Sequence, residues 1–306
     1  NVGAAGGRIV GVCDLDAEKA ERNAGRFGGR PFGDLAVMLD TVKPDGVIVC
    51  IGPEAHAKIA TQVLTLGYPV YTEKPPAATA ADALAVARVA AETGQLCTTA
   101  FKKRYSQGNN RAVEWLKQFP AEDRYMISID YCSAQYKNES SRNSFLLDFC
   151  IHIIDLVGYL FGDVSRVFTF SKGLDAYAVS LTFASGAVGT LSLNCGRSFQ
   201  IPTEEIEISV RGGNFMSLHN SSCWRITEGG KPVEWREPPT FTSSGDSGND
   251  TGHLAELADY VAALKEGRKT TRSNIYESYK SLVLYEAIKA SAEKVAVVDV
   301  EYELPP

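Results

Sequence analysis

Two parts of the sequence hold side chains that together could move a proton. Glu73 and Lys74 end the apolar run PVYTE just before two prolines. Asp148 and His152 are four residues apart in SFLLDFCIHIIDLVGYLFG, a spacing that places them on one face of a helix. A lysine, a carboxylate and an imidazole can polarise an oxygen, orient a ring and accept a proton. Taken singly, each also has a structural interpretation, because charged turns are usually solvated and a lone histidine on an apolar helix is usually interior.

Two further strand ends could hold a ligand. Asp14 ends the run RIVGVCD, where a carboxylate can accept hydrogen bonds from both hydroxyls of an adenosine ribose and would repel a 2′-phosphate. Alternatively, Asp14 or Asp16 only caps the next helix. In CIGPEAH, the Gly52-Pro53 turn lets a flat ring approach the backbone closely. His56 follows in the first helical turn, where a structural role competes with a catalytic one.

These strand ends belong to an alternating pattern that predicts a doubly wound, parallel, Rossmann-like sheet. Short β-branched runs predict strands at 8–14, 46–51, 69–73 and 95–100. Periodic segments predict helices at 16–27, 54–67 and 79–94. In such sheets ligands bind beyond the carboxyl ends of the strands, so the residues singled out above should meet at one edge. We therefore expect a dinucleotide-binding domain over residues 1–104.

The glycine loop that binds a pyrophosphate is missing from this pattern. A G-x-G-x-x-G loop should follow a first strand about 20 residues before the ribose carboxylate. Only NVGAAGGR precedes the strand at 8–14, so Gly3, Gly6 and Gly7 are interpreted as a turn leaving an upstream helix. We expect the chain to begin inside the domain, lacking its first strand and glycine loop, and an export signal upstream stays open.

The pattern predicts an α+β domain over residues 105–306, which we expect to bind the substrate and to form the oligomer contacts. Helices are expected at 111–119 and 145–161, and a strand at 124–133. Consecutive strands at 164–171, 175–184, 187–195 and 204–211, with connections such as ASGA, predict a mostly antiparallel open sheet. Shorter strands are expected at 214–219, 223–227 and 232–236. A flexible loop (242–250), two helices (251–266 and 276–293) and a last strand, AVVDVEY, complete the chain.

The amino-acid composition excludes several classes of binding partner and of metal site. The 306 residues carry 31 basic and 37 acidic side chains, and a net charge of −6 argues against nucleic acid or an anionic membrane as partner. No apolar stretch approaches the roughly 20 residues of a membrane-spanning helix. Seven cysteines without a C-x-x-C, several inside apolar runs, indicate free thiols in a reducing, cytoplasmic compartment. Four histidines without H-E-x-x-H predict no metal site.

At this point the motifs resemble the glucose-fructose oxidoreductase, inositol dehydrogenase and rhizopine catabolism (Gfo/Idh/MocA) family. DGVIVCIGPEAHAKIATQVLTLGYPVYTEKP is similar to its central stretch, with the E-K-P motif at Glu73, Lys74 and Pro75. AFKKRYS is similar to its strand ending in basic residues, and LLDFCIHIIDLVGYLFG to its D-x-G-x-H-x-x-D helix, matched at Asp148, His152 and Asp155. The likeness extends over nearly the whole chain. Cys150 stands in place of the usual glycine, and Pro76 in place of a common leucine.

The resemblance implies an NAD-dependent oxidoreductase that transfers a hydride between nicotinamide and a secondary alcohol of a sugar, inositol or related polyol. It implies that Lys74, Asp148 and His152 are catalytic. We assign His152 as the proton acceptor, Asp148 as the group that orients its ring, and Lys74 as a donor to the alcohol oxygen. NAD is expected over NADP, because no arginine directly follows Asp14. The expected cofactor contacts are Asp14, Leu15, Ile51, Gly52, Pro53, His56, Glu73 and Lys74.

The sequence indicates substrate contacts and the oligomeric state less specifically than it indicates the cofactor site. Candidates for substrate contacts are Lys103, Arg104, Tyr131 and the loop around 138–143, all of which could instead be solvated. The open sheet has one face with no obvious helical cover, which predicts a homodimer or homotetramer. Two other functions stay open: an NAD-dependent enzyme that cleaves a glycoside through transient oxidation and elimination, and a non-catalytic nucleotide-binding subunit.

Overall fold

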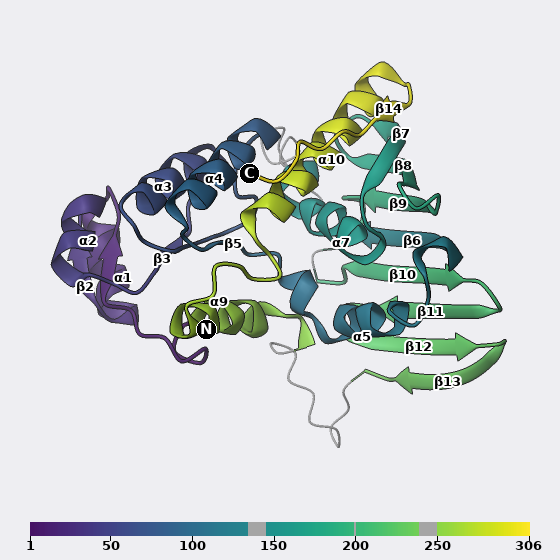
Figure 1. Cartoon of the computed structure of the whole chain (residues 1–306), viewed down its shortest axis with the longest axis horizontal. Coiled ribbons are helices and arrows are strands. Elements are labelled where there is room, and N and C mark those ends of the chain that lie inside the picture. The colour runs from purple at the N-terminus through teal and green to yellow at the C-terminus, as the bar shows by residue number, and fades with distance from the viewer. Residues whose placement is uncertain (134–144, 199, 239–249) are drawn as a thin grey trace.

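The computed structural model describes residues 1–133, 145–198, 200–238 and 250–306. The loop around 138–143 and nearly all of the predicted flexible loop at 242–250 lie outside these residues. In Figure 1 the parallel strands of the N-terminal half lie on the left and a large sheet lies on the right. None of the described helices is both long enough and apolar enough to cross a membrane.

The N-terminal half alternates strands and helices, as predicted. Local signals set the helix ends: the Asp16 carboxylate accepts hydrogen bonds from two first-turn N–H groups, Thr79 caps a second helix, and Gly94 ends it in the left-handed conformation. The sequence interpretation missed one strand and one helix, β2 and α2, although Asp34 caps α2 in the same way. The elements are β1 (Gly11–Cys13), α1 (Ala17–Phe27), β2 (Arg30–Phe32), α2 (Leu35–Val42), β3 (Val47–Val49), α3 (Pro53–Thr65), β4 (Val70–Thr72), α4 (Ala80–Thr93) and β5 (Cys97–Thr99).

These strands form two parallel sheets, β1-β2 and β3-β4-β5. No described strand lies between β1 and β3, the position that the first strand of a doubly wound sheet occupies. Residues 1–6 form turns rather than a strand followed by a phosphate loop. The architecture is the Rossmann-like sheet without its first strand that the sequence predicts for this chain.

The C-terminal half is built on one nine-stranded sheet of order β13-β12-β11-β10-β6-β9-β8-β7-β14. Only the β6–β9 pair is parallel among these neighbours, which confirms the prediction of a mostly antiparallel sheet. The strands are β6 (Arg124–Cys132), β7 (Val164–Lys172), β8 (Ala176–Phe183), β9 (Val188–Asn194), β10 (Thr203–Val210), β11 (Asn214–His219), β12 (Cys223–Glu228), β13 (Lys231–Arg236) and β14 (Val298–Asp299).

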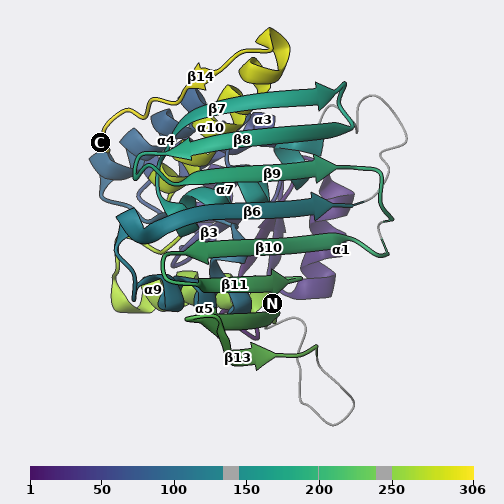
Figure 2. The ribbon, with the colours of Figure 1, turned by 90° about the vertical axis from the view of Figure 1, so that its right-hand side faces the viewer.

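Helices cover one face of this sheet, and Figure 2 shows the other face without a helical layer. The covered face buries a large apolar core that includes Trp115, Phe145 and Ile151. The remaining elements are η1 (Lys102–Tyr105), α5 (Gln107–Leu116), η2 (Ala121–Asp123), η3 (Phe145–Phe149), α7 (Ile151–Phe161), α9 (His253–Glu266) and α10 (Ile275–Lys294).

Two late helices return to the N-terminal half. Leu257 and Tyr260 of α9 pack against Tyr71 and Leu96 beside the three-stranded sheet. The Tyr260 hydroxyl donates to the carbonyl of Val47 at 3.3 Å, and α10 packs along α4. In Figure 1 both helices reach between the two halves. This packing joins the parallel strands and α4 to helices from the C-terminal part of the chain.

Candidate functional site

Lys74 and Asp148 form one of the contacts between the two halves. Lys74 lies in the loop directly after β4, and its ammonium donates to the Asp148 carboxylate at 2.7 Å and to the Asp148 carbonyl at 2.8 Å. The Lys74 side chain is 19% exposed and that of Asp148 is 51% exposed. An ammonium has three donors, so one N–H of Lys74 is left for another acceptor.

Asp148 does not orient His152, contrary to the role that we assigned to it. The segment around Asp148 is the π-helical turn η3, in which the Cys150 N–H donates to the carbonyl of Phe145, five residues back. The prediction assumed one continuous α-helix through both residues, whereas Asp148 lies in η3 and His152 lies in α7, which begins at Ile151. Among the described residues the His152 Nδ1 atom has no hydrogen-bond partner, while the Asp148 carboxylate accepts from Lys74.

His152 is buried on the first turn of α7, with only 9% of its surface exposed. The edge of its ring meets Phe101 with 6.3 Å between centroids. Burial holds its pKa well below the usual value, and the positive charges of Lys74, Lys103 and Lys102 lower it further. His152 is therefore neutral at neutral pH, and the positive charge of Lys74 contributes to its lowered pKa. Its Nδ1 atom has no hydrogen-bond partner among the described residues.

Two of the predicted substrate contacts, Lys103 and Tyr131, lie together. The Lys103 ammonium pairs with Glu204 of β10, is 3.4 Å from the Ser221 hydroxyl and lies over the Tyr131 ring at 4.9 Å from its centroid. Lys103 and Glu204 are both buried. The positive charge of Lys103 acts on His152, so this cluster borders the same region.

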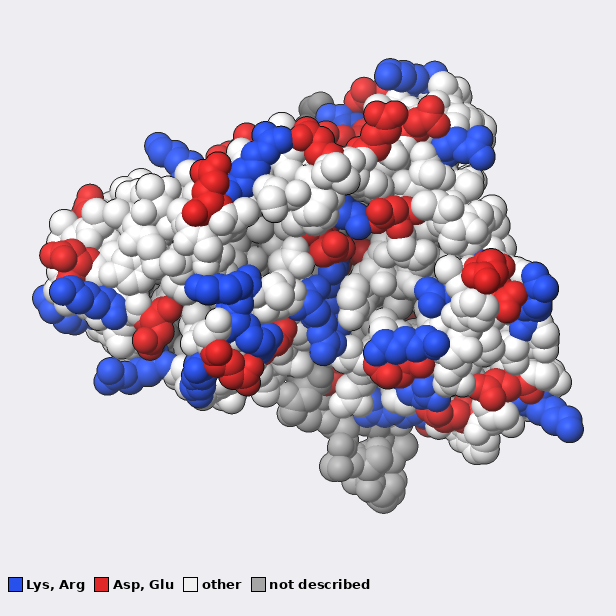
Figure 3. All heavy atoms as spheres, in the orientation of Figure 1, with Lys and Arg blue, Asp and Glu red and all other residues white. Residues whose placement is uncertain are grey.

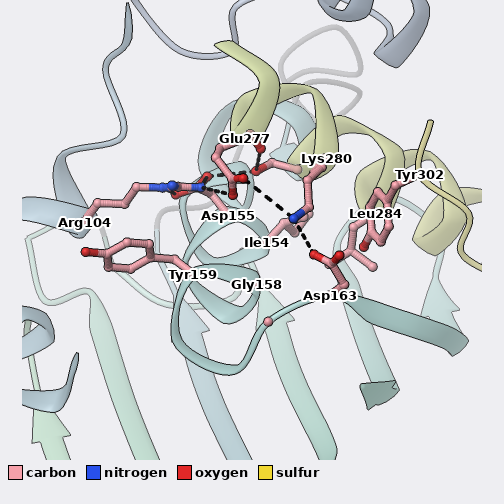
Figure 4. A pocket seen from close by; sticks show the side chains of 12 residues that line it. Arg104, Ile154, Asp155, Gly158, Tyr159, Asp163, Glu277, Lys280, Leu284 and Tyr302 are labelled. Carbon is pink, nitrogen blue, oxygen red and sulfur yellow. Dashed lines mark hydrogen bonds and ion pairs between the residues drawn. The ribbon is translucent and has the colours of Figure 1, made fainter. Parts of the chain in front are cut away.

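Arg104, the third predicted substrate contact, points into the interior instead. Its guanidinium donates to both oxygens of Asp155, at 2.9 and 2.7 Å, and to the Arg272 carbonyl at 2.8 Å. Asp155 also accepts from the Ser281 hydroxyl at 2.8 Å. Figure 4 shows this pair beside a small polar pocket that Glu277 and Lys280 also line. The geometry does not support a substrate contact for Arg104, because its side chain is buried and already donates to Asp155 and to the Arg272 carbonyl.

The predicted cofactor contacts lie at the carboxyl ends of β1, β3 and β4. Asp16, and not Asp14, caps α1, while Asp14 uses one carboxylate oxygen to accept from the Asp16 backbone at 2.9 Å. The apolar side chains of Leu15 and Ile51 are 99% and 44% exposed. Gly52 and Pro53 form the turn into α3, with Gly52 as the N-cap and Pro53 in the first turn.

His56 connects two of these strand ends. It is fully buried, its Nδ1 lies 2.7 Å from the Pro75 carbonyl, and its Nε2 accepts from the Ile51 backbone at 3.3 Å. A carbonyl only accepts, so Nδ1 carries the proton and the ring is neutral. Burial lowers the pKa of His56, consistent with that state. The residue holds the Glu73–Pro76 loop against the loop after β3, which makes it a positioning group for both.

Three residues near the site were not singled out from the sequence: Lys102, His253 and Glu256. His253 and Glu256 lie on the first turn of α9, and their charges couple to that of Lys102. Glu256 is buried beside Tyr71, one of its carboxylate oxygens has no partner among the described residues, and burial raises its pKa to about 8. Nothing in the local pattern of α9 marks these residues, because the helix reaches the site only through long-range packing.

The described part of the chain holds no group of three or more histidine, cysteine or acidic side chains that could bind a metal ion. Over the face seen in Figure 3, Lys and Arg side chains are interspersed with Asp and Glu.

Comparisons with known proteins agree with this architecture. Residues 3–101 match a family described as an oxidoreductase family with an NAD-binding Rossmann fold, and residues 127–300 match the C-terminal alpha/beta domain of that family. The chain is 24% identical to a D-apiose dehydrogenase of Paraburkholderia graminis, over 97% of this chain and 84% of that protein. It is 25% identical to a 4-carboxy-2-hydroxymuconate-6-semialdehyde dehydrogenase of a Sphingobium species, over 90% of this chain and 89% of that protein.

Among solved structures, the fold is similar to that of an oxidoreductase from Agrobacterium radiobacter in complex with NAD+, L-tartaric acid and magnesium. The TM-score is 0.83 at 17% identity, covering 98% of this chain and 94% of that chain. At this identity the similarity establishes the fold.

Proposed function

Because the chain belongs to the Gfo/Idh/MocA oxidoreductase family, with its NAD-binding Rossmann domain and its C-terminal α/β domain, we propose that it oxidises a secondary alcohol of a sugar, inositol or related polyol. The observation that carries this proposal is the contact of Lys74 with Asp148 beside the buried, neutral His152. The dehydrogenase names of the relatives are consistent with chemistry at a CH–OH group.

The residues at the strand ends fit a dinucleotide. The second carboxylate oxygen of Asp14 and the Glu73 carboxylate, which has no hydrogen-bond partner among the described residues, can accept from ribose hydroxyls. Exposed Leu15 and Ile51 offer apolar surface to flat rings. NAD bound there would supply the hydride acceptor.

In this proposal Lys74 and His152 both contact the substrate hydroxyl that is oxidised. His152 accepts the hydroxyl proton, because its imidazole is neutral at neutral pH. The remaining N–H of Lys74 donates to the oxygen as negative charge develops on it. Asp148 acts as a positioning residue that fixes the ammonium through two hydrogen bonds. Lys103 and Tyr131 supply contacts to the other hydroxyls.

The test is NAD reduction by the purified protein over a panel of sugars and polyols, followed at the nicotinamide absorbance. The variant His152→Ala should lower turnover about a hundredfold or more, as loss of a general base does. His219→Ala, which removes an exposed histidine on β11, serves as the matched control and should keep full turnover. Full turnover in His152→Ala contradicts the role assigned to this residue.

The glycoside-cleaving alternative predicts a different product balance. It returns the hydride to the substrate, so free sugar would be released without net NADH accumulation. A protein that binds NAD but reduces it with no member of the panel would instead be a nucleotide-binding subunit. Either result contradicts the proposed dehydrogenase.

Cofactor choice rests on Asp14, whose carboxylate would repel a 2′-phosphate. We expect NAD to bind more tightly than NADP in calorimetry, and Asp14→Ala to narrow that difference. Tighter binding of NADP by the unmodified protein contradicts this assignment.

Assembly and compartment complete the proposal. Phe170, Val188 and Phe215 alternate with core residues along their strands and expose apolar surface on the uncovered sheet face. These exposed apolar side chains support burial of this face in a homodimer or homotetramer. A monomeric mass in light scattering would refute this oligomeric assembly. The seven cysteines are all described, none is in a disulfide bond and four are buried, which supports a reducing compartment such as the cytoplasm.

A further inference from the structure

A buried network of three polar side chains lies beside the candidate site, and the mechanism above uses only one of them, Lys103. The Lys103 ammonium, on η1, pairs with one carboxylate oxygen of Glu204 on β10. The Ser221 hydroxyl donates to the other oxygen of Glu204 at 2.6 Å and lies 3.4 Å from the Lys103 ammonium. All three residues are buried. Both oxygens of this carboxylate are therefore occupied by groups from two other segments of the chain.

Ser221 has an unusual backbone conformation for a serine. It lies in the turn between β11 and β12, where Asn220 and Ser221 have φ values of +48° and +63°. Glycine and asparagine adopt this left-handed region most readily, whereas a serine there is strained. The Ser221 carbonyl accepts from the Gly108 N–H at 2.8 Å, and a Cβ atom at Gly108 would lie 2.8 Å from that oxygen. The turn thus packs closely against the first turn of α5, which holds the Ser221 hydroxyl at Glu204.

The contact with Glu204 favours the charged form of Lys103. Burial lowers the pKa of Lys103 well below its usual value, and the positive charge of Lys102 adds to this shift. A carboxylate in direct contact opposes the shift, since an opposite charge favours the ionised form. Water competes little for this pair, because the two side chains are only 6% and 8% exposed. Loss of Glu204 would therefore leave Lys103 either neutral or as an unpaired buried charge.

Two ring contacts connect this network to the proposed catalytic groups. The Lys103 ammonium lies over the Tyr131 ring, 4.9 Å from its centroid. The Tyr131 ring stacks on that of Phe149, with 4.3 Å between centroids and 15° between planes. Phe149 directly follows Asp148, whose carboxylate accepts from Lys74. Lys103 and Tyr131 therefore lie beside the η3 turn that carries Asp148.

We propose that Glu204 and Ser221 are positioning residues, which hold the Lys103 ammonium where it contacts a hydroxyl of the substrate other than the one that is oxidised. Through its contact with Lys103, the Tyr131 ring is held in the same place. The inference rests on the proposed dehydrogenase function and adds two residues that determine the affinity for the substrate. Neither residue contacts the reacting atoms. Their loss should therefore raise KM for the sugar or polyol, whereas kcat and KM for NAD depend on other groups.

The variant Ser221→Gly tests this proposal without adding backbone strain. It removes the hydroxyl, and glycine adopts the left-handed conformation freely. The control Asn220→Gly makes a similar exchange at the exposed neighbouring residue, whose φ is also positive. The substrate is whichever of D-glucose, D-galactose, D-glucitol and myo-inositol has the highest kcat/KM with NAD. We expect Ser221→Gly to raise KM for this compound about threefold to tenfold, with kcat and KM for NAD changed by less than about twofold. Asn220→Gly should leave all three constants unchanged.

A double variant, Lys103→Met with Glu204→Met, separates substrate binding from folding. A buried ion pair can often be replaced by apolar side chains of similar volume without loss of stability. We expect the melting temperature to stay close to that of the unmodified protein, and KM for the sugar or polyol to rise about tenfold to a hundredfold. An unchanged KM in the folded double variant would show that the pair only stabilises the fold. If the double variant does not fold, the result for Ser221→Gly decides.

Three results overturn the inference: Ser221→Gly leaves KM for the sugar or polyol unchanged, it changes kcat and both KM values by the same factor, or Asn220→Gly raises KM equally. Failure of the proposed function is a separate result, in which no compound of the four reduces NAD. Calorimetry then compares the binding of the same compounds to the unmodified protein and to Ser221→Gly, because binding does not require turnover. Equal binding to both proteins, or binding of no compound, overturns the inference in that case.

Discussion

Two ion pairs connect the end of a parallel strand to the same segment, η3 and α7, and they differ in what they leave free. Lys74 with Asp148 is partly exposed, at 19% and 51%, and one N–H of Lys74 has no acceptor in the part of the chain that the structure describes. Arg104 with Asp155 is closed off, at 3% and 0%, and further hydrogen bonds from Arg104 to Arg272 and from Ser281 to Asp155 complete it. The open pair can act on a substrate, whereas the closed pair can only hold the domains together.

The difference has a physical basis. Burying a charge pair costs free energy unless its groups find partners, and Arg104 and Asp155 find theirs inside the protein, in each other, the Arg272 carbonyl and the Ser281 hydroxyl. A pair at a surface tolerates an unsatisfied donor, because water fills the place until a substrate arrives. Figure 4 shows the closed arrangement around Arg104 and Asp155.

The largest effect is expected from breaking the closed pair. Asp155→Ala leaves the buried Arg104 guanidinium without its counter-ion and should lower the free energy of unfolding by about 3–5 kcal/mol. Urea denaturation measures this. The control Glu114→Ala removes one partner of an exposed pair with Lys117 and should change stability by less than about 1 kcal/mol. Equal losses of unfolding free energy in the two variants would show that the buried pair contributes no more to stability than the exposed pair.

The next effect concerns the open pair. Lys74→Met should lower kcat/KM about a hundredfold, because it removes the donor to the developing oxygen charge. Its effect on stability should be much smaller than that of Asp155→Ala, since Asp148 is half exposed and can be solvated. Lys289→Met, at an exposed position on α10, is the matched control. Full turnover in Lys74→Met would remove the functional distinction between the two pairs.

The smallest effect is on the titration of His152. Its pKa lies well below the usual value, so kcat/KM should stay level as the pH falls to about 6.5 and decline only at lower pH. Removing the positive charge of Lys74 makes protonation easier, so Lys74→Met should move this decline, and the imidazole titration followed by NMR, to higher pH. An unchanged titration would mean that the Lys74 charge does not reach His152.

Local patterns accounted for much of the fold. The β-branched runs and the capping residues Asp16, Thr79 and Gly94 gave the strands and helices of the N-terminal half, apart from the three-residue strand β2 and the short helix α2. Because the carboxyl ends of parallel strands lie at one edge of a sheet, the sequence also predicted that Asp14, Glu73 and Lys74 lie at that edge. These local patterns could not predict which side chains form ion pairs. Asp148 contacts Lys74, which is 74 residues away in the sequence, and not His152, which is four residues away.

The sequence by itself determined which chemical groups this protein carries and the strand ends and helix that present them, because propensity, capping and periodicity act within a few residues. Only the tertiary structure decided which partners those groups have. Packing between the two halves pairs the Asp148 carboxylate with Lys74 and not with His152, the register of β10 brings Glu204 to Lys103, and α9 carries Glu256 to the neighbourhood of Lys102. Each of these contacts joins distant segments, so its geometry depends on the packing of the whole core rather than on any local pattern.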